Sequence, residues 1–246
     1  IKILFVLIFA TACSSTWEIQ DVDGDGKTIL DGDCWDSTAD PVPPKGALNY
    51  GITALDIGPE QLDLPYDGID QNCDGKDDFD QDGDGRIPDI FVGIQTIGLE
   101  NTGNLEGGDC WDNPTPPTID SRAQNYEITS DQIFKGALED FSYDGIDQNC
   151  DGKDDFDQDG DGFVPDEYEG IGTQIELIDV EGNAVRTAMV DGTGELPSGD
   201  CFDMVPEDED TTDFIPLNGF PSLLPEDVHP NSEDPVYDGV DQSCDG

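Results

Sequence analysis

Residues 66–85 read YDGIDQNCDGKDDFDQDGDG, and residues 143–162 repeat these letters without a change. A third copy begins at Tyr237 and reads YDGVDQSCDG. Two further elements recur with this one: DxDGDG at 21–26, 80–85 and 157–162, and Gly-Asp-Cys-aromatic-Asp at 32–36, 108–112 and 199–203. Such internal repetition predicts an array of similar units, each in contact mainly with its neighbours.

The repeats divide the chain into a targeting segment at 1–12, a tether at 13–20 and three units at 21–76, 77–153 and 154–246, the last of which we expect to be truncated. Residues 173–190 alternate apolar and polar side chains on both sides of Glu181-Gly182-Asn183, which predicts a β-hairpin. We also expect a strand at 91–97 and a short helix at 130–139, capped by Ser130. The predicted fold is otherwise irregular: a loop-rich, elongated tandem array with little β structure.

The composition is strongly acidic. The 246 residues include 59 acidic and 9 basic side chains, which gives a formal net charge of −50. This balance excludes nucleic acid as a partner and disfavours anionic membranes, because both require a basic surface. Apolar residues make up 35% of the chain, too little for one large core. Since the charge also opposes compaction, folding requires metal ions or high salt unless the chain is disordered.

Six of the seven cysteines fall into three pairs with similar separations: Cys34 and Cys73 (39 positions), Cys110 and Cys150 (40), and Cys201 and Cys244 (43). We predict one disulfide in each unit, which implies an oxidising compartment. On the chain-entropy model each bridge adds about 4 kcal/mol of stability. Zinc ligation is the alternative, but zinc favours CxxC spacing and histidine partners, and His229 is the only histidine.

The N-terminus resembles a targeting signal. Lys2 precedes an apolar run that ends at Ala10 and is too short to span a bilayer. Ala10-Thr11-Ala12-Cys13 then resembles a lipobox, so Cys13 is the candidate lipidation site and a lipid anchor is the one expected membrane contact. A cleaved signal peptide and a retained, ordered segment remain alternatives. The lipobox and the signal peptide both predict a secreted or outer-surface location.

DxDGDG has the spacing of a calcium-binding loop, with oxygen ligands at positions 1, 3 and 5, glycine at 6 and a backbone carbonyl at 7. Alternate side chains of a tight loop converge on one point, and glycine permits the sharp turn. None of the loops has glutamate at position 12, so a remote carboxylate must complete each site. We choose the aspartates that flank each motif cysteine. The predicted ligands are Asp21, Asp23, Asp25, Lys27 (carbonyl), Asp33 and Asp36; Asp80, Asp82, Asp84, Arg86 (carbonyl), Asp109 and Asp112; and Asp157, Asp159, Asp161, Phe163 (carbonyl), Asp200 and Asp203.

The closing element contains the same spacing again as D-x-[NS]-x-D-G, ten residues before the next DxDGDG, so that Asp78 or Asp155 could serve either loop. Six loops in register with six cysteines favour about six or more structural Ca²⁺ ions. Acidic residues that only solvate a chain would not fix glycine at position 6. The predicted ligands of these loops are Asp70, Asn72, Asp74 and Lys76 (carbonyl); Asp147, Asn149, Asp151 and Lys153 (carbonyl); and Asp241, Ser243 and Asp245.

DxDGDG, DC-x-D and YDGxDQNCDG, in this order, resemble the metal-binding repeat of the MopE-like family of bacterial surface proteins. They are also similar in style to thrombospondin type 3 calcium repeats. HPNSE at 229–233 comes close to the family's HPGAxE, whereas the inserts at 86–107 and 163–198 exceed the usual repeat. The resemblance implies an outer-surface location and a calcium-dependent structure. One branch of the family is associated with copper, which needs soft or imidazole ligands that are scarce in this chain.

These features predict an extracellular calcium-binding repeat protein with a structural or adhesive role, of which a filament or surface-layer subunit is one specific form. Its expected partners are calcium and either copies of itself or surface glycans and proteins. A calcium-dependent glycan- or ligand-binding module is the main alternative, and a copper-binding surface protein is a weaker one. We expect no enzyme, because a single histidine and no nucleophile context leave no catalytic constellation.

Overall fold

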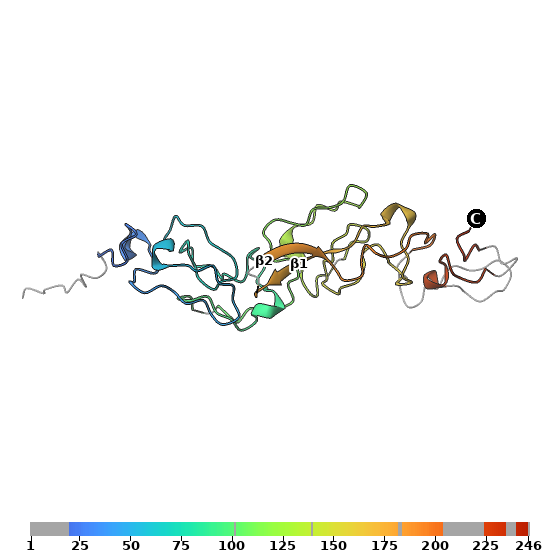
Figure 1. Cartoon of the computed structure of the whole chain (residues 1–246). Coiled ribbons are helices and arrows are strands. Elements are labelled where there is room, and N and C mark those ends of the chain that lie inside the picture. The colour runs from blue at the N-terminus through green and yellow to red at the C-terminus, as the bar shows by residue number, and fades with distance from the viewer. Residues whose placement is uncertain are drawn as a thin grey trace, which may run out of the picture.

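The computed structural model describes residues 20–100, 102–138, 140–181, 184–203, 224–234 and 240–245. Figure 1 shows an elongated molecule in which the units follow one another along the long axis. Most of the described residues lie in turns and irregular loops, as predicted. The predicted targeting segment at 1–12, Cys13 and nearly all of the tether lie outside the described residues. Among those residues, no helix has the length and apolar character needed to cross a membrane.

In the described ranges, helical structure is limited to single 3-10 turns. Thr53 donates its backbone N–H to the carboxylate of Asp56 at 2.9 Å, and Thr129 donates to Gln132 at 3.0 Å, so these turns are held by side chains in place of a longer helix. The turns are η2 (Ile29–Asp31), η3 (Ala54–Asp56), η4 (Asp89–Phe91), η5 (Ser130–Gln132), η6 (Asp166–Tyr168) and η7 (Pro225–Asp227).

Two predictions of local structure are wrong. The expected strand at 91–97 does not form: η4 ends at Phe91, and Gly93 then adopts a φ of 84°, a left-handed turn that interrupts an extended chain. The expected helix at 130–139 is reduced to η5, with Thr129 at its N-cap in place of Ser130. It ends because the N–H of Phe134 donates to the carbonyl of Gln148 at 2.9 Å.

The predicted β-hairpin is confirmed. Strands β1 (Gln174–Asp179) and β2 (Ala184–Met189) pair antiparallel, with Gln174 opposite Met189. Figure 1 shows the hairpin lying over the middle of the molecule. The N–H of Glu176 donates to the carbonyl of Cys110 at 2.9 Å, and Ile178 packs against apolar residues of the first two units. The insert of the third unit therefore braces the two units before it.

The buried apolar side chains of the described residues form three small clusters, in agreement with a composition too poor for one large core. In two of them an aromatic side chain of the YDG element stacks on one from the next unit, Tyr66 on Phe91 at 5.1 Å and Tyr143 on Tyr168 at 5.2 Å between centroids. The clusters consist of Leu48, Tyr66, Phe79, Ile87 and Phe91; of Trp111, Ile128, Ile133 and Ile146; and of Phe156, Val164, Tyr168 and Ile171.

All three predicted disulfides are confirmed: Cys34–Cys73, Cys110–Cys150 and Cys201–Cys244. Each joins the Gly-Asp-Cys element of one unit to the closing loop of the same unit. Cys110 and Cys150 pack against the cluster that contains Trp111, so this bridge is part of the second core.

Candidate metal centres

Each DxDGDG loop folds around its own backbone amides. In the second unit, the Asp80 carboxylate accepts the N–H groups of Gly83 and Gly85 at 2.9 and 3.2 Å, and Asp82 accepts that of Asp84 at 3.1 Å. The loops that begin at Asp21 and Asp157 repeat this pattern. These hydrogen bonds hold the carboxylates inside the loop. The side chains at positions 1, 3 and 5 therefore point toward one interior point, and oxygen atoms of Asp80, Asp82 and Asp84 lie within 4.8 Å of one another.

The aspartates that flank the motif cysteine join this loop. Asp112 accepts the N–H groups of Gln81 and Asp82 at 2.6 and 3.3 Å, and Asp109 accepts that of Trp111 at 2.8 Å. Oxygen atoms of Asp82, Asp109 and Asp112 lie within 4.8 Å of one another. We call each such assembly of a DxDGDG loop and two flanking aspartates an A site, and number the three A1 to A3 in chain order.

The same assembly occurs at the other two A sites. At A1, Asp36 accepts the N–H of Val22 at 2.5 Å, and oxygen atoms of Asp21, Asp23 and Asp36 lie within 4.8 Å of one another. At A3, Asp203 accepts the N–H of Gln158 at 2.6 Å. The structure therefore brings together the loop and the remote aspartates that the sequence pairs, in all three units.

The second oxygen of most A-site carboxylates is buried and has no hydrogen-bond partner. Asp112 has an exposed fraction of 0%, and Asp109 and Asp200 of 6% each, so water cannot easily solvate these atoms. An unpaired buried carboxylate oxygen is costly, and several around one point repel each other. The buried carboxylates of each A site therefore require a positive charge or protons to neutralise them. The unpaired atoms are one Oδ2 each of Asp23, Asp33 and Asp36; of Asp82, Asp84, Asp109 and Asp112; and of Asp159, Asp161, Asp200 and Asp203.

Without a cation, burial makes these groups retain protons. Desolvation, aided by the charges of neighbouring aspartates, raises the pKa of Asp112 to about 10 and that of Asp109 to about 8. At A3 the pKa of Asp203 and that of Asp159 rise to about 7 for the same reasons. Protons and a metal ion therefore compete for the same oxygen atoms.

We expect the metal-free protein to be more stable at pH 5 than at pH 8. Carboxyls with a pKa near 3.8 when unfolded and about 8 to 10 when folded hold a proton only in the folded state within that window. The free energy of unfolding then falls as pH rises, by up to about 1.4 kcal/mol per pH unit and group. A bound divalent cation reverses the trend, because it requires the deprotonated form. Thermal unfolding in cation-free and cation-containing buffer at both pH values measures this, and a metal-free Tm that rises with pH contradicts it.

The D-x-[NS]-C-D-G loops, which we call B1 to B3, fold in the same way. In B2 the Asp147 carboxylate accepts the N–H groups of Asp151 and Gly152 at 3.0 and 2.8 Å, and Asn149 also accepts that of Asp151 at 2.8 Å. Cys150 adopts a φ of 54°, the left-handed conformation that Gly160 adopts at the same position of A3. B1 repeats these contacts, and in B3 the N–H of Asp245 donates to Asp241 at 3.2 Å. In B3, Ser243 also donates its hydroxyl to Asp241 at 3.4 Å.

One ligand candidate of the B loops was missed by the sequence analysis. Oxygen atoms of Asp140, Asp147 and Asp151 lie within 4.8 Å of one another. Asp140 accepts the N–H of Gln148 at 3.1 Å, and Asp63 accepts that of Gln71 at 3.0 Å in the first unit. The signal was present in the sequence, because an aspartate stands seven residues before each B loop, at 63, 140 and 234.

Asp78 and Asp155, which could serve either of two loops by sequence, are both buried. Asp155 lines a cavity of about 220 Å³ together with Asp140, Asp147 and Asp151 on the B2 side and Asp157 of the A3 loop. Asp155 also accepts the N–H of Gly145 at 2.6 Å, as Asp78 does from Gly68 at 2.5 Å. Each of these carboxylates therefore holds a YDG turn, and Asp155 also lies between B2 and the A3 loop.

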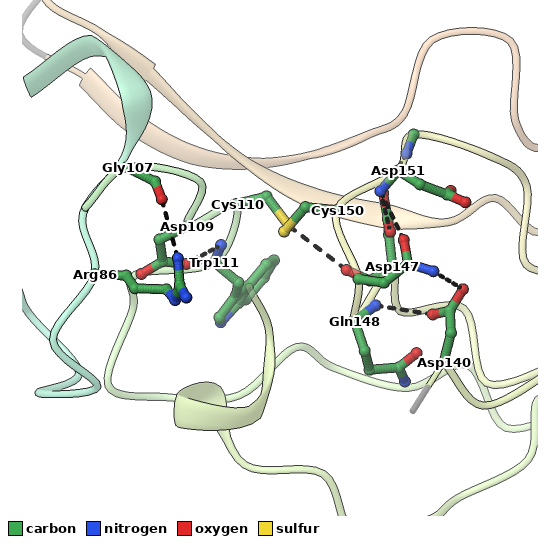
Figure 2. The surroundings of a disulfide bond; sticks show 12 residues. Arg86, Gly107, Asp109, Cys110, Trp111, Asp140, Asp147, Gln148, Cys150 and Asp151 are labelled. Carbon is green, nitrogen blue, oxygen red and sulfur yellow. Dashed lines mark hydrogen bonds between the residues drawn. A yellow bond between two sulfur atoms is a disulfide. The ribbon is translucent and has the colours of Figure 1, made fainter. Parts of the chain in front are cut away.

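The disulfide of the second unit connects an A site to a B loop. Figure 2 shows Cys110, between Asp109 and Trp111, bonded to Cys150 beside Asp147. Sγ of Cys110 lies 3.5 Å from the carbonyl oxygen of Asp147. The bridge therefore fixes the remote aspartates of A2 relative to B2.

The fold and these sites define a disulfide-linked repeat protein that carries metal-binding motifs. The family model Cu-binding_MopE, described as "Putative metal-binding motif", matches residues 53–79, 129–156 and 226–246, so the chain contains three copies of this family's repeat. The resemblance seen in the sequence is thereby confirmed. No curated protein and no solved structure matches the chain. The matched segments include the B loops and Asp63 and Asp140, whereas the A sites lie outside them.

The donors at these sites do not fit the copper in the family's name. The carboxylate and amide oxygens gathered at A2 and B2 are hard ligands, whereas copper favours imidazole, thiolate or thioether groups. Six cysteines are in disulfides. The ring of His229 stacks on Phe163 at 5.1 Å, and its Nδ1 lies 3.3 Å from the backbone nitrogen of Asn231 as an acceptor.

Asp112→Asn is expected to change stability in opposite directions with and without a cation. The amide keeps the acceptor for Gln81 and can donate to neighbouring carboxylates, so the metal-free protein gains stability by about 1–3 kcal/mol. The cation at A2 loses one charged ligand, and its affinity falls by about tenfold or more. Thermal unfolding and metal titration of the variant measure both effects. Asp191→Asn, at an exposed position after β2, is the control and should change neither; equal destabilisation in both states would contradict the role of Asp112.

Proposed function

We propose that the protein is an extracellular calcium-binding repeat protein with a structural or adhesive role at the cell surface. The observation that carries this proposal is the set of A sites, in which carboxylates from two separate motifs converge and leave buried oxygen atoms unpaired. Calcium takes six to eight oxygen ligands in flexible geometry and is the ion that D-x-D-x-D-G loops select. Magnesium is less suitable, because it demands near-ideal octahedral geometry and keeps its waters.

The location and the non-enzymatic role rest on two further features. Three disulfides favour a secreted or outer-surface protein, with a lipid anchor at Cys13 as the proposed attachment. The acidic residues at the sites are committed to loop amides and to their neighbours, which leaves no free acid–base pair there for catalysis. A calcium-filled, disulfide-linked rod is suited to spacing, adhesion or assembly.

Calorimetric titration of the oxidised, chelator-stripped protein with Ca²⁺ tests the proposal. We expect about six or more bound ions, at dissociation constants of about 10⁻³ M or tighter. Titration with Cu²⁺ and Cu⁺ distinguishes the copper alternative, which predicts tight copper binding that calcium does not displace. If the titration gave no saturable heat of calcium binding, the proposed function would be overturned.

The assembly role is tested separately. We expect sedimentation of the mature protein in millimolar calcium to show association as the concentration rises. A protein that stays monomeric under these conditions would exclude the filament and surface-layer forms. Binding to a glycan array that requires calcium would instead favour the ligand-binding module.

A further inference from the structure

The two kinds of loop differ in how their carboxylates are neutralised. Among the described residues, every A site leaves several buried carboxylate oxygens without a partner. Asp70, Asp74, Asp147 and Asp151 of the B loops leave none, and Asp78, between B1 and the A2 loop, leaves one. A2 gathers five carboxylates, those of Asp80, Asp82, Asp84, Asp109 and Asp112. B2 gathers four, those of Asp140, Asp147, Asp151 and Asp155, and Asn149 contributes a neutral amide at the middle position of the loop.

The B loops also carry an internal positive charge. Lys76 Nζ lies 3.0 Å from Oδ2 of Asp74, and Lys153 Nζ lies 3.0 Å from Oδ2 of Asp151. Each lysine immediately follows the glycine of its loop, and its ammonium group pairs with the carboxylate at position 5, a predicted metal ligand. At A2 the same position is Arg86, whose guanidinium group turns away to Glu106 at 3.5 Å and lies over the ring of Phe134 at 4.7 Å. At A1 the same position is Lys27, which pairs with Glu60 at 3.5 Å. Within the described part of the chain, neither basic side chain forms an ion pair with an A-site carboxylate.

We infer that the A sites and B loops form two classes of calcium site: the A sites fill first and tightly, and the B loops fill last, in competition with Lys76 and Lys153. This inference rests on the proposed calcium function. Affinity in such loops follows the number of charged ligands and the rigidity of the site, and both favour the A sites. Desolvated carboxylates without a partner also gain more from an ion than exposed carboxylates that already have one.

The consequence is a protein whose fold and surface respond to different calcium concentrations. A2 and A3 stand at the junctions between units, since the Tyr66 hydroxyl donates to the carbonyl of Asp112 at 3.3 Å and the Tyr143 hydroxyl donates to that of Asp203. They would stay filled while calcium at the B loops exchanges. Ambient calcium would then change the charge of the B-loop surface without unfolding the rod.

Two measurements on the oxidised full chain test this inference. Calcium titration should resolve a tight and a weak class, separated by at least about tenfold in dissociation constant. Terbium, a hard oxygen-seeking ion, should identify the tight class, because emission excited through tryptophan requires a nearby indole. Trp35 and Trp111 lie between the flanking aspartates of A1 and A2, but the cluster of Trp111 also packs against Cys150 of B2. The first terbium ions bound should be luminescent. Asp112→Asn at A2 should reduce that early signal, whereas Asp151→Asn at B2 should leave it unchanged.

The lysines are tested by Lys76→Met with Lys153→Met. This variant should tighten the weak class by about two- to fivefold, because it removes an ammonium group that competes with the ion for an exposed carboxylate, and it should leave the tight class unchanged. Lys45→Met with Lys135→Met removes the same charge from exposed lysines outside both loops and is the control. A single class of equivalent sites, early terbium without luminescence, or equal effects of both variants would overturn the inference while the calcium function stands. Absence of calcium binding would overturn the proposed function itself.

Discussion

Chelation of calcium at neutral pH is expected to expand the oxidised protein and to release the packing of Trp111. Three A sites, each held at about a hundredfold excess of calcium over its dissociation constant, would together contribute about 8 kcal/mol. Domains are stable by only about 5–15 kcal/mol, so this loss removes most of the stability. The small apolar clusters cannot oppose the repulsion of a chain with a net charge of −50.

Small-angle scattering and near-ultraviolet circular dichroism of the same sample measure this effect. We expect the radius of gyration to increase and the tryptophan signal to collapse, and both to recover when calcium is restored. Concentrated sodium chloride is the control, because it screens repulsion without filling the buried oxygen positions of the A sites. A metal-free protein that keeps both signals at low salt would show that the carboxylates fold without an ion.

Removal of the second disulfide is expected to have the next largest effect. Cys110→Ser with Cys150→Ser should cost about 4 kcal/mol on the chain-entropy model, since the bridge closes a loop with a sequence separation of 40. It should also weaken the cation at A2, because Asp109 and Asp112 lose their connection to the B2 loop. Chemical denaturation with calcium present measures the stability, and terbium luminescence through Trp111 measures the site.

Cys201→Ser with Cys244→Ser is the matched control. It opens a loop of similar length, with a separation of 43, but touches A3 and B3 instead. We expect a similar loss of stability without a change in the Trp111 signal. If both variants reduced that signal equally, the disulfide would act only on global stability and not on the position of the A2 aspartates.

The loops and disulfides could be predicted from the sequence because their information is local or strictly periodic. The D-x-D-G-D-G spacing dictates how Asp80, Asp82 and Asp84 converge, and the repeat places Cys110 opposite Cys150. Asp140 was missed because it lies seven residues before the loop pattern. The sequence did contain a signal for it, since an aspartate occurs at the same interval before each B loop. The predictions of a strand at 91–97 and a helix at 130–139 were wrong, because intrinsic secondary-structure propensity is a weak guide where tertiary contacts between loops determine the backbone conformation.

The sequence by itself determined the repeat architecture, the metal-loop chemistry and the disulfide pairing, since each depends on spacing along the chain. Only the tertiary structure decided which carboxylate oxygens are left unpaired and which are neutralised by Lys76 and Lys153. It also decided that the hairpin of the third unit packs on the first two, through contacts such as Tyr66 with Glu176 at 3.2 Å. Burial and solvation depend on neighbours distant in sequence, and the free energy of a charged group depends on those neighbours more than on its own position in a motif.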